Sequence, residues 1–349
     1  MNYFSNYDPY QRISLNTQID ILENEILKRY PNVLEILLRD QTTKNNILWA
    51  TNNYEYLGQL YCSEKEITLK LITGSNGDVI MPRVQKDKIL QQTRAREMAE
   101  EFTPSWICNS QNNLIDNAWF CKENTFNEEI KLSDGSWGWK VNAKKITFPE
   151  KKDWKNYIQD KRLEIACGEA PYITSRYDTT TGAFIPINER IGILDRKLRV
   201  INENTNISGE WLKAVQSAFK STYAYEWQGD SLLLAREAML FTFIENYRLK
   251  FNTEPLLKSI KYIAYIISWN VWQMDGIKGV TPNSCRDIDK FETNLFDENK
   301  TTRIKCEGCE KDNIKKHNGI YSLVKNWSNI DKTTGRKGKK IRYIDLLNN

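Results

Sequence analysis

One stretch decides the fold of this chain: Leu163-Glu164-Ile165-Ala166-Cys167-Gly168-Glu169-Ala170-Pro171-Tyr172. Its first residues have the composition of a short strand, and Gly168 falls in the turn behind that strand. In an open α/β sheet a nucleoside cofactor lies outside the carboxyl ends of the strands, where a tight glycine turn lets the backbone approach it closely. The stretch therefore predicts a strand of an α/β sheet followed by a cofactor loop.

The sequence after this stretch alternates between helical and strand-like segments. The apolar periodicity predicts helices over 188–200, 209–219, 230–247 and 255–267, and a strand over 223–226. Alternation of this kind is typical of an open α/β sheet. The predicted fold class is therefore α/β.

Two further acidic residues hold positions that suit a nucleoside. Glu226 ends the predicted strand 223–226, and an acid at that place commonly accepts hydrogen bonds from ribose hydroxyls. Asp275 follows another apolar stretch and could lie near the exocyclic amine of an adenine. Taken singly, either residue is more often a helix cap or a solvated side chain. The order and spacing of the two residues along the chain strengthen the assignment of both to a nucleoside site.

The N-terminal part is predicted to form an extension before the sheet. Apolar spacing over 15–39 indicates two helices broken at Pro31, and alternation over 67–80 indicates a β-hairpin. A charged helix is predicted over 86–101. The expected organisation is an extension at 1–92, a cofactor-binding domain at 93–280, and a loop-rich segment with cysteines at 281–349.

Three motifs together resemble a known family. They are Phe102-Thr103-Pro104, Glu164-Ile165-Ala166-Cys167-Gly168 and Tyr225-Glu226. In this order they are similar to the Phe/Tyr-Thr-Pro signature, the Asp-Pro-Ala-Cys-Gly-Ser-Gly motif and the acidic motif of DNA adenine methyltransferases from restriction-modification systems. The resemblance runs from Arg94 to Asp275 and points to the group labelled restriction endonuclease subunit M.

This resemblance implies a Rossmann-like class I methyltransferase sheet, preceded by the helical and hairpin extension. It implies S-adenosylmethionine (SAM) as the methyl donor, double-stranded DNA as a partner, and an adenine amino group, flipped out of the duplex, as the methyl acceptor. The residues that it assigns to SAM binding are Phe102, Thr103, Pro104, Glu164, Cys167, Gly168, Glu226 and Asp275.

The chain departs from the family pattern at places that bear on catalysis. Glu164 stands where the family has Asp, Ile165 where it has Pro, and Glu169-Ala170 where it has Ser-Gly. No Pro-Pro dipeptide occurs in the sequence, so the Asn-Pro-Pro-Tyr loop that positions the target amino group is missing. We therefore expect the SAM-binding part of a split or truncated enzyme, with a second polypeptide supplying the catalytic loop and target recognition.

Two other classes of function stay open. A non-catalytic DNA-binding or specificity subunit could keep a degenerate methyltransferase fold, and the missing loop favours it. A nuclease would need paired carboxylates and a lysine around a divalent metal. The nearest candidate, Glu150 with Lys152, fits a solvated turn better.

Cysteine spacing near the C-terminus suggests a metal site. Cys306-Glu307-Gly308-Cys309 is a knuckle-like Cys-x-x-Cys, with Cys285 upstream and the single histidine of the chain, His317, downstream. Thiolate and imidazole ligands are typical of zinc. A single Cys-x-x-Cys is also compatible with a pair of surface thiols, so both interpretations stay open. The odd number of cysteines, seven, favours reduced thiols over a disulfide framework.

The net charge favours a polyanionic partner only weakly. Lys and Arg number 50 against 45 Asp and Glu, a net charge of +5. The pI of 8.6 lies below the value of about 9 expected of a dedicated nucleic-acid module. The run 332–342 is strongly basic and could contact phosphates or form a solvated loop. A second basic group could line DNA or lie on a solvated helix face: Arg190, Arg196, Lys197 and Arg199.

No segment of the sequence suits a membrane. There is no apolar stretch of about 18 residues or more, as a membrane span would need, and the mean hydropathy is -0.62. The first residues lack the basic-then-apolar layout of a signal peptide. We therefore expect a cytoplasmic protein without membrane contact.

Overall fold

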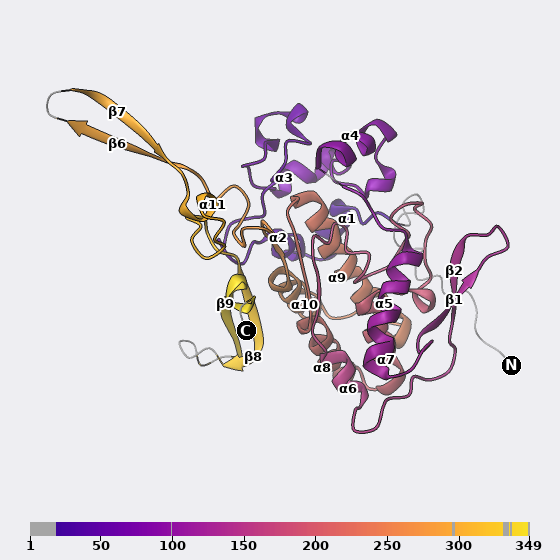
Figure 1. The fold of residues 1–349 in the computed structure, drawn as a ribbon. Coiled ribbons are helices and arrows are strands. Elements are labelled where there is room, and N and C mark those ends of the chain that lie inside the picture. The colour runs from indigo at the N-terminus through magenta and orange to yellow at the C-terminus, as the bar shows by residue number, and fades with distance from the viewer. Residues whose placement is uncertain (1–18, 99, 295–296, 331–334, 336, 348–349) are drawn as a thin grey trace.

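The structure is a computed structural model (Figure 1) that describes residues 19–347 except 99, 295–296, 331–334 and 336. The centre of its fold is a three-stranded parallel sheet. The strands are β3 (Arg162–Glu164), β4 (Thr222–Glu226) and β5 (Val271–Gln273), in the order β3-β4-β5. Both strand pairs are parallel. All three carboxyl ends therefore meet at one edge of the sheet.

Helices form the connections between these strands. β3 is joined to β4 through α7 (Ile193–Asn204) and α8 (Ser208–Lys220), and β4 to β5 through α9 (Gly229–Phe251) and α10 (Leu257–Asn270). Helix α9 is buried on all sides from Gly229 to Arg248, as expected of a helix in the middle of a fold. The helices predicted in this part and the strand 223–226 are confirmed, with shifted boundaries.

The remaining elements surround this unit. The other helices are α1 (Glu23–Arg29), α2 (Val33–Leu38), α3 (Leu69–Ile72), α4 (Lys88–Met98), α5 (Ser105–Phe120), α6 (Trp154–Gln159) and α11 (Glu307–Glu310). Three antiparallel hairpins pair β1 (Asn127–Lys131) with β2 (Trp137–Val141), β6 (Ile288–Asn294) with β7 (Asp297–Ile304), and β8 (Leu323–Ile330) with β9 (Lys337–Arg342). Short 3-10 helices lie at Glu55–Leu57, Gln59–Tyr61, Gly74–Asn76, Arg83–Gln85, Ile187–Glu189 and Tyr343–Leu346. Figure 1 shows the β6–β7 hairpin standing away from the body, whereas β8–β9 lies beside α10.

Two hydrophobic clusters hold the chain together. The larger one runs from Ile21 in the N-terminal part to Val271 in β5 and includes the inward faces of the four connecting helices. The smaller one joins the other face of the sheet to the β8–β9 hairpin through Trp272, Met274, Val324 and Tyr343. Burying one such side chain stabilises the fold by about 1.5–3 kcal/mol, so the larger cluster supplies most of the stability.

Expectations for the flanking parts are met only in part. The helices predicted over 15–39 are confirmed as α1 and α2, with residues 15–18 outside the described part of the chain. The β-hairpin expected over 67–80 is wrong: that stretch forms α3 and a 3-10 turn, and Leu71 and Ile72 are buried side by side on the short helix. The segment 281–349 was expected to be loop-rich, but it contains the hairpins β6–β7 and β8–β9.

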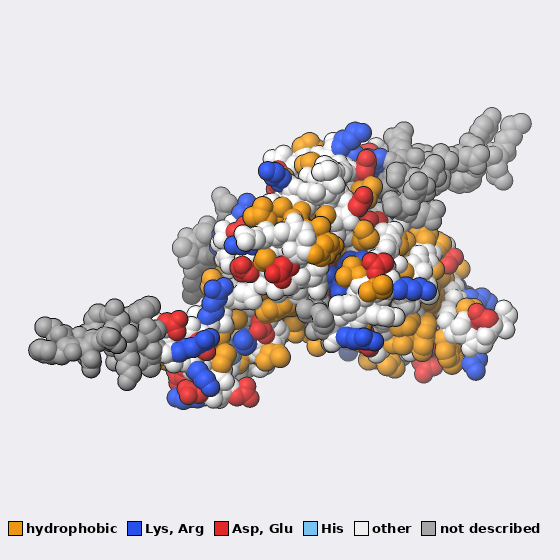
Figure 2. Space-filling view, turned by 90° about the horizontal axis from the view of Figure 1, so that it is seen from above, with side chains coloured by type: hydrophobic (Ala, Val, Ile, Leu, Met, Phe, Trp, Pro, Cys, Tyr) orange, Lys and Arg blue, Asp and Glu red, His pale blue; other side chains and the backbone are white. Residues whose placement is uncertain are grey.

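At the level of fold class, the expected mixed α/β architecture is confirmed, with one three-stranded parallel sheet and two-stranded hairpins. The surface carries charges of both signs: on the face shown in Figure 2, Lys and Arg side chains are interspersed with Asp and Glu. Among the described residues, no helix combines the length and the apolar character that a bilayer span requires.

Three buried carboxyl groups lie between α1 and α9. Asp20 precedes α1, Glu23 begins it, and Glu237 lies in the middle of α9; all three are buried. Burial raises the pKa of each group, that of Asp20 to about 7, and repulsion between neighbouring carboxylates adds to the rise. Within the described part of the chain, neither carboxyl oxygen of Glu237 has a hydrogen-bond partner. Ionising these groups therefore costs stability.

We expect the free energy of unfolding to fall as the pH rises from about 5 to about 8. The folded-state pKa values lie above the unfolded values of about 4, so the folded chain holds protons that the unfolded chain has released. This stabilisation is present below the unfolded pKa and is lost as the pH rises through the folded pKa. Glu237→Gln should flatten the profile and raise the free energy of unfolding at pH 8 by about 1–2 kcal/mol.

Urea denaturation at several pH values measures this effect. Glu210→Gln, a change of an exposed residue in α8, is the matched control and should reproduce the wild-type profile. The interpretation fails if Glu237→Gln follows the same profile as the control.

Candidate functional site

The carboxyl ends of β3 and β4 open into a cavity of about 520 Å³. Its walls come from segment 100–103 before α5, segment 163–168 around the end of β3, and segment 226–231 between β4 and α9. Helix α5 closes one side with Gln111, Asn112 and Ile115. The volume lies in the range of about 300–1,000 Å³ that is typical of small-molecule sites. The cavity is placed where an α/β sheet binds a ligand.

The structure brings together most of the residues that the sequence motifs single out. Those that line the cavity are Phe102, Thr103, Glu164, Cys167, Gly168 and Glu226. Pro104 is the N-cap residue of α5, directly after this wall. Asp275 does not line the cavity: its carboxylate accepts hydrogen bonds from the backbone N–H groups of Ile277 and Lys278, both at 3.0 Å. Asp275 therefore closes the turn after β5.

The turn behind β3 depends on left-handed backbone. Ala166, Gly168 and Ala170 have φ angles of 47°, 52° and 60°. A Cβ atom on Gly168 would lie 3.3 Å from Cε1 of Phe102, so glycine also lets that ring pack against the turn. The Phe102 ring is also near a cation, with the Arg83 guanidinium 5.4 Å from the ring centroid. Two motifs far apart in the sequence thus form one wall.

Glu226 ties the end of β4 to the glycine turn. One carboxylate oxygen accepts from the backbone N–H of Gly168 at 2.8 Å, and the other accepts from those of Trp227 at 2.9 Å and Gln228 at 3.0 Å. Burial raises the pKa of Glu226, and the three backbone N–H groups oppose the rise. A carboxylate offers about four acceptor positions. The oxygen bonded to Gly168 therefore keeps one position for a ligand hydroxyl.

Glu164 contributes to the cavity wall a carboxyl group with one oxygen that lacks a hydrogen-bond partner in the described part of the chain. One of its oxygens accepts from the backbone N–H of Tyr172 at 3.4 Å. The other oxygen, Oε2, is buried and has no hydrogen-bond partner among the described residues. Burial raises the pKa of Glu164 well above its usual range. A buried acceptor without a partner is costly, and a cationic ligand group in the cavity would offset that cost.

Glu169-Ala170, the departure from Ser-Gly, has a structural explanation. The Glu169 side chain accepts from the backbone N–H of Arg83 at 2.6 Å and from the Tyr177 hydroxyl at 2.5 Å. It is buried and does not line the cavity. Glu169 thus fastens the glycine turn to the 3-10 helix at Arg83–Gln85.

A buried ion network behind the cavity could not be seen in the sequence. Asp230, in the first turn of α9, pairs with Arg94 at 2.8 Å and Lys86 at 3.2 Å. Arg94 also pairs with Glu100 at 2.5 Å and donates to Gln228 at 3.1 Å, and both of these residues line the cavity. Although burial opposes it, Arg94 and Lys86 hold the pKa of Asp230 far below its usual range. The network fixes two walls of the cavity relative to each other.

Most of the basic residues around α7 lie inside the protein and not on a solvated helix face; Arg199 alone of the four is half-buried, and it pairs with Glu203 at 2.9 Å. Arg190, Arg196 and Lys197 are buried. Arg190 pairs with Glu245 at 2.6 Å, and Arg196 pairs with Asp116 at 2.6 Å. These charges connect helices inside the protein.

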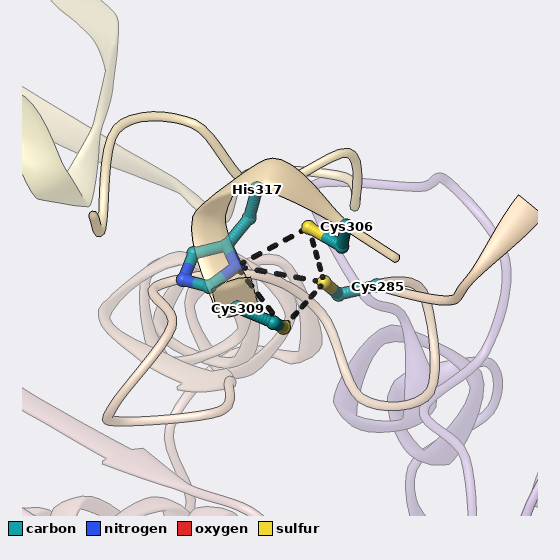
Figure 3. A group of neighbouring side chains, drawn as sticks. All are labelled: Cys285, Cys306, Cys309 and His317. Atoms are coloured by element: carbon teal, nitrogen blue, oxygen red, sulfur yellow. Dashed lines mark hydrogen bonds between the residues drawn. The ribbon is translucent and has the colours of Figure 1, made fainter. Parts of the chain in front are cut away.

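A second candidate site lies in the C-terminal part. The side chains of Cys285, Cys306, Cys309 and His317 converge on one point (Figure 3), and their ligand atoms all lie within 4.8 Å of one another. The Cys285 sulfur is 3.3 Å from that of Cys306 and 3.6 Å from that of Cys309. His317 Nδ1 lies 3.5–3.6 Å from the three sulfurs. The four residues named from sequence spacing thus form one cluster.

The local backbone is built for this convergence. Cys285 precedes β6, Cys306 caps α11, and Cys309 lies within α11, one turn further on. A Cβ atom on Gly308 would lie 2.6 Å from both the backbone nitrogen and Nδ1 of His317, so only glycine allows the imidazole to approach. The cluster closes the base of the β6–β7 hairpin.

The thiols of the cluster differ in acidity. Burial alone would raise the pKa of Cys306, but hydrogen bonds from the backbone N–H groups of Cys309 and Asn318 lower it to about 6. Burial and hydrogen bonds to its two neighbours raise the pKa of Cys285 to about 12. A thiolate is the form that binds metals, and the hydrogen bonds to Cys306 favour that form.

Comparison of the chain with protein-family models, curated protein sequences and solved structures found no match. The functional case therefore depends on the two sites and on the motifs that form them.

Proposed function

We propose that this chain binds SAM in the cavity at the carboxyl ends of β3 and β4. It would be the cofactor-binding part of a DNA adenine methyltransferase, with a Rossmann-like sheet completed by a second polypeptide. The observation that carries the proposal is the meeting of three motifs at one cavity: Phe102-Thr103, the glycine turn at Gly168, and Glu226.

The chemistry of the cavity fits the cofactor. Glu226 keeps an acceptor position for a ribose hydroxyl. The unpartnered oxygen of Glu164 would accept from the ammonium of the methionine moiety, because a nearby positive charge favours the ionised carboxylate. When bound, SAM supplies the methyl group. The residues of this chain would orient it, and the acceptors for the target amino group would come from the second chain.

The exposed edge of the sheet supports a second polypeptide. Among the described residues, β3 pairs only with β4, so its outer edge is open. Leu163 in β3 and Ile165 directly after it are 44% and 64% exposed, and both also line the cavity. An apolar groove of about 190 Å³ runs beside Leu163 toward the β8–β9 hairpin, lined in part by Tyr223 and Ile341. An unpaired apolar edge is a site for strand addition.

A second function, as a non-catalytic DNA-binding subunit, predicts the same fold but no SAM affinity. Equilibrium dialysis with labelled SAM separates the two. We expect micromolar binding by the wild-type chain and at least about ten-fold weaker binding by Glu226→Ala, because a charge-assisted acceptor is lost. Glu210→Ala, exposed in α8, should bind like wild type. Equal affinity of Glu226→Ala and wild type would contradict the proposal.

The chain alone is expected to transfer no methyl groups. Incubating it with methyl-labelled SAM and duplex DNA should leave the DNA unlabelled, because the sequence contains no Asn-Pro-Pro-Tyr loop to position the target amino group. Labelled DNA in this assay would show that the chain is a complete enzyme and would remove the need for a second polypeptide.

We propose zinc as the metal of the cysteine–histidine cluster. Tetrahedral ligands at about 2.3 Å from zinc are separated by about 3.8 Å, and the ligand-atom distances of 3.3–3.6 Å come close to this spacing. Four protein ligands leave no open coordination position, which is typical of a structural zinc. The ion would hold together the base of the β6–β7 hairpin.

A further inference from the structure

Four lysines from four separate parts of the chain gather beside the β8–β9 hairpin. We call them the lysine row: Lys44 after α2, Lys220 at the end of α8, Lys325 in β8 and Lys340 in β9. They alternate with aromatic rings from α10 and β8: Tyr262, Tyr265, Trp269 and Trp327. Figure 1 shows β8–β9 lying against α10, where these elements meet.

Three of the four ammonium groups surround one indole. Lys44, Lys325 and Lys340 lie 4.6, 5.3 and 5.7 Å from the Trp269 ring centroid. No two of them can therefore be more than about 11 Å apart, which is close to the Debye length of about 8–10 Å in physiological salt. Three like charges at this separation repel one another.

The row continues along the hairpin. Lys325 also lies 4.6 Å from the Trp327 ring centroid, and Lys220 lies 5.3 Å from the same ring and 5.1 Å from that of Tyr262. The Trp327 indole is fixed by a hydrogen bond of 2.8 Å from its Nε1 to Asn270. The ring faces hold the lysines in place, so the cations form a preorganised group that extends through shared rings from Trp269 to Tyr262.

The charge of the row is offset only weakly in the described part of the chain, where Asp40 attracts Lys44 without forming an ion pair. None of the four lysines has a carboxylate within ion-pair distance there, whereas buried arginines such as Arg196 are paired. Burial, followed by repulsion from Lys340, lowers the pKa of Lys44. Exposed cation–π contacts contribute only about 0.5–1 kcal/mol each. A polyanion along the row would remove the repulsion.

We propose that the lysine row binds the phosphodiester backbone of DNA. A line of cations fits a polymer that carries one negative charge per about 1.7 Å of duplex axis better than a single phosphate. Because the ring faces are occupied by ammonium groups, the contact is with the backbone and not by base stacking, and it carries no sequence preference. The choice of duplex DNA rests on the proposed function, whereas the phosphate chemistry does not.

The test is the salt dependence of DNA binding by the full chain. A fluorescent duplex of about 24 base pairs is titrated at several salt concentrations with wild type and with Lys44→Gln/Lys220→Gln/Lys325→Gln/Lys340→Gln. Each lost phosphate contact reduces the slope of log K against log salt by about 0.9. We expect affinity to fall at least about ten-fold and the slope to drop by about 3.6 if all four lysines contact phosphates.

A matched control removes four exposed lysines elsewhere: Lys28, Lys70, Lys122 and Lys145. It should keep the wild-type slope. The inference is overturned if the two quadruple variants behave alike, if the wild-type chain does not bind the duplex, or if vesicles of phosphatidylserine bind the row more tightly than DNA.

A second readout does not depend on variants. Acetylation of the wild-type chain with and without the duplex, followed by mass spectrometry, should show protection of Lys44 and Lys340 but not of Lys28. Equal reactivity at all three would overturn the inference. The SAM affinity of the lysine variant should equal that of wild type. If the row binds DNA but the chain does not bind SAM, the proposed function is wrong while the lysine row remains a DNA-binding surface.

Discussion

Gly168→Val is expected to weaken SAM binding by at least about 100-fold while the chain stays folded. Gly168 has a φ of 52°, a conformation that a β-branched residue rarely adopts. Its new Cβ would lie 3.3 Å from the Phe102 ring, and the further methyl groups would enter the cavity. A 100-fold loss corresponds to about 2.8 kcal/mol of binding free energy. Calorimetric titration with SAM measures it.

The control for this change is Gly209→Val. Gly209 lies in the first turn of α8, and a Cβ there meets nothing within 4 Å. This variant should bind SAM like wild type. Circular dichroism checks that both valine variants fold. Retention of wild-type affinity by a folded Gly168→Val would show that SAM does not contact the glycine turn.

Cys306→Ser is expected to reduce bound zinc from near one ion per chain to nearly none. Structural zinc sites bind with apparent free energies of about 10–16 kcal/mol, and replacing one of four ligands removes a large share of that energy. The base of the β6–β7 hairpin should then become accessible, so limited proteolysis should cut between Asp287 and His317. Elemental analysis and peptide mapping measure the two effects.

Cys121→Ser is the matched control for the metal site. Cys121 is an exposed cysteine after α5 that belongs to no cluster. Its replacement should leave the zinc content and the proteolysis pattern unchanged. A wild-type chain purified without zinc that also fails to take up added Zn²⁺ would contradict the metal assignment.

Two of the three central strands, β3 and β4, and the cavity at their ends could be predicted from the sequence because their signals are local. A short apolar segment ending in a glycine turn at Gly168, and a second one ending at Glu226, each occupy a few consecutive residues. The Cys306-x-x-Cys309 spacing is local in the same way. Cys285 and His317 could be proposed as further ligands only because they are the nearest other thiol and the single imidazole. The structure shows that both lie beside that pair.

Features that depend on long-range pairing could not be predicted. Arg196 is charged, so the sequence alone favours a solvated or DNA-facing position; its partner Asp116 lies 80 positions away and buries it. The ion pair of Lys86 with Asp230 joins residues 144 positions apart. The hairpin expected over 67–80 failed for a related reason, because packing of Leu71 and Ile72 against the core overrides the local alternation.

The lysine row could not be predicted from the sequence either. Its four lysines come from different segments, and only Lys340 belongs to the basic run at 332–342 that the sequence makes visible. Residues 332–334 and 336 of that run lie outside the described part of the chain. The surface therefore emerges only when α8, α10 and the β8–β9 hairpin are assembled.

Hydrogen–deuterium exchange of the whole chain, with and without saturating SAM, tests the central claim most directly because it locates the ligand. Bound SAM should slow exchange in three segments: 100–104, 163–172 and 226–231. The peptides covering β1–β2 and β6–β7 should be unchanged. No change in the three segments at saturating SAM, or protection confined to other parts of the chain, would contradict the assignment of this cavity to the cofactor.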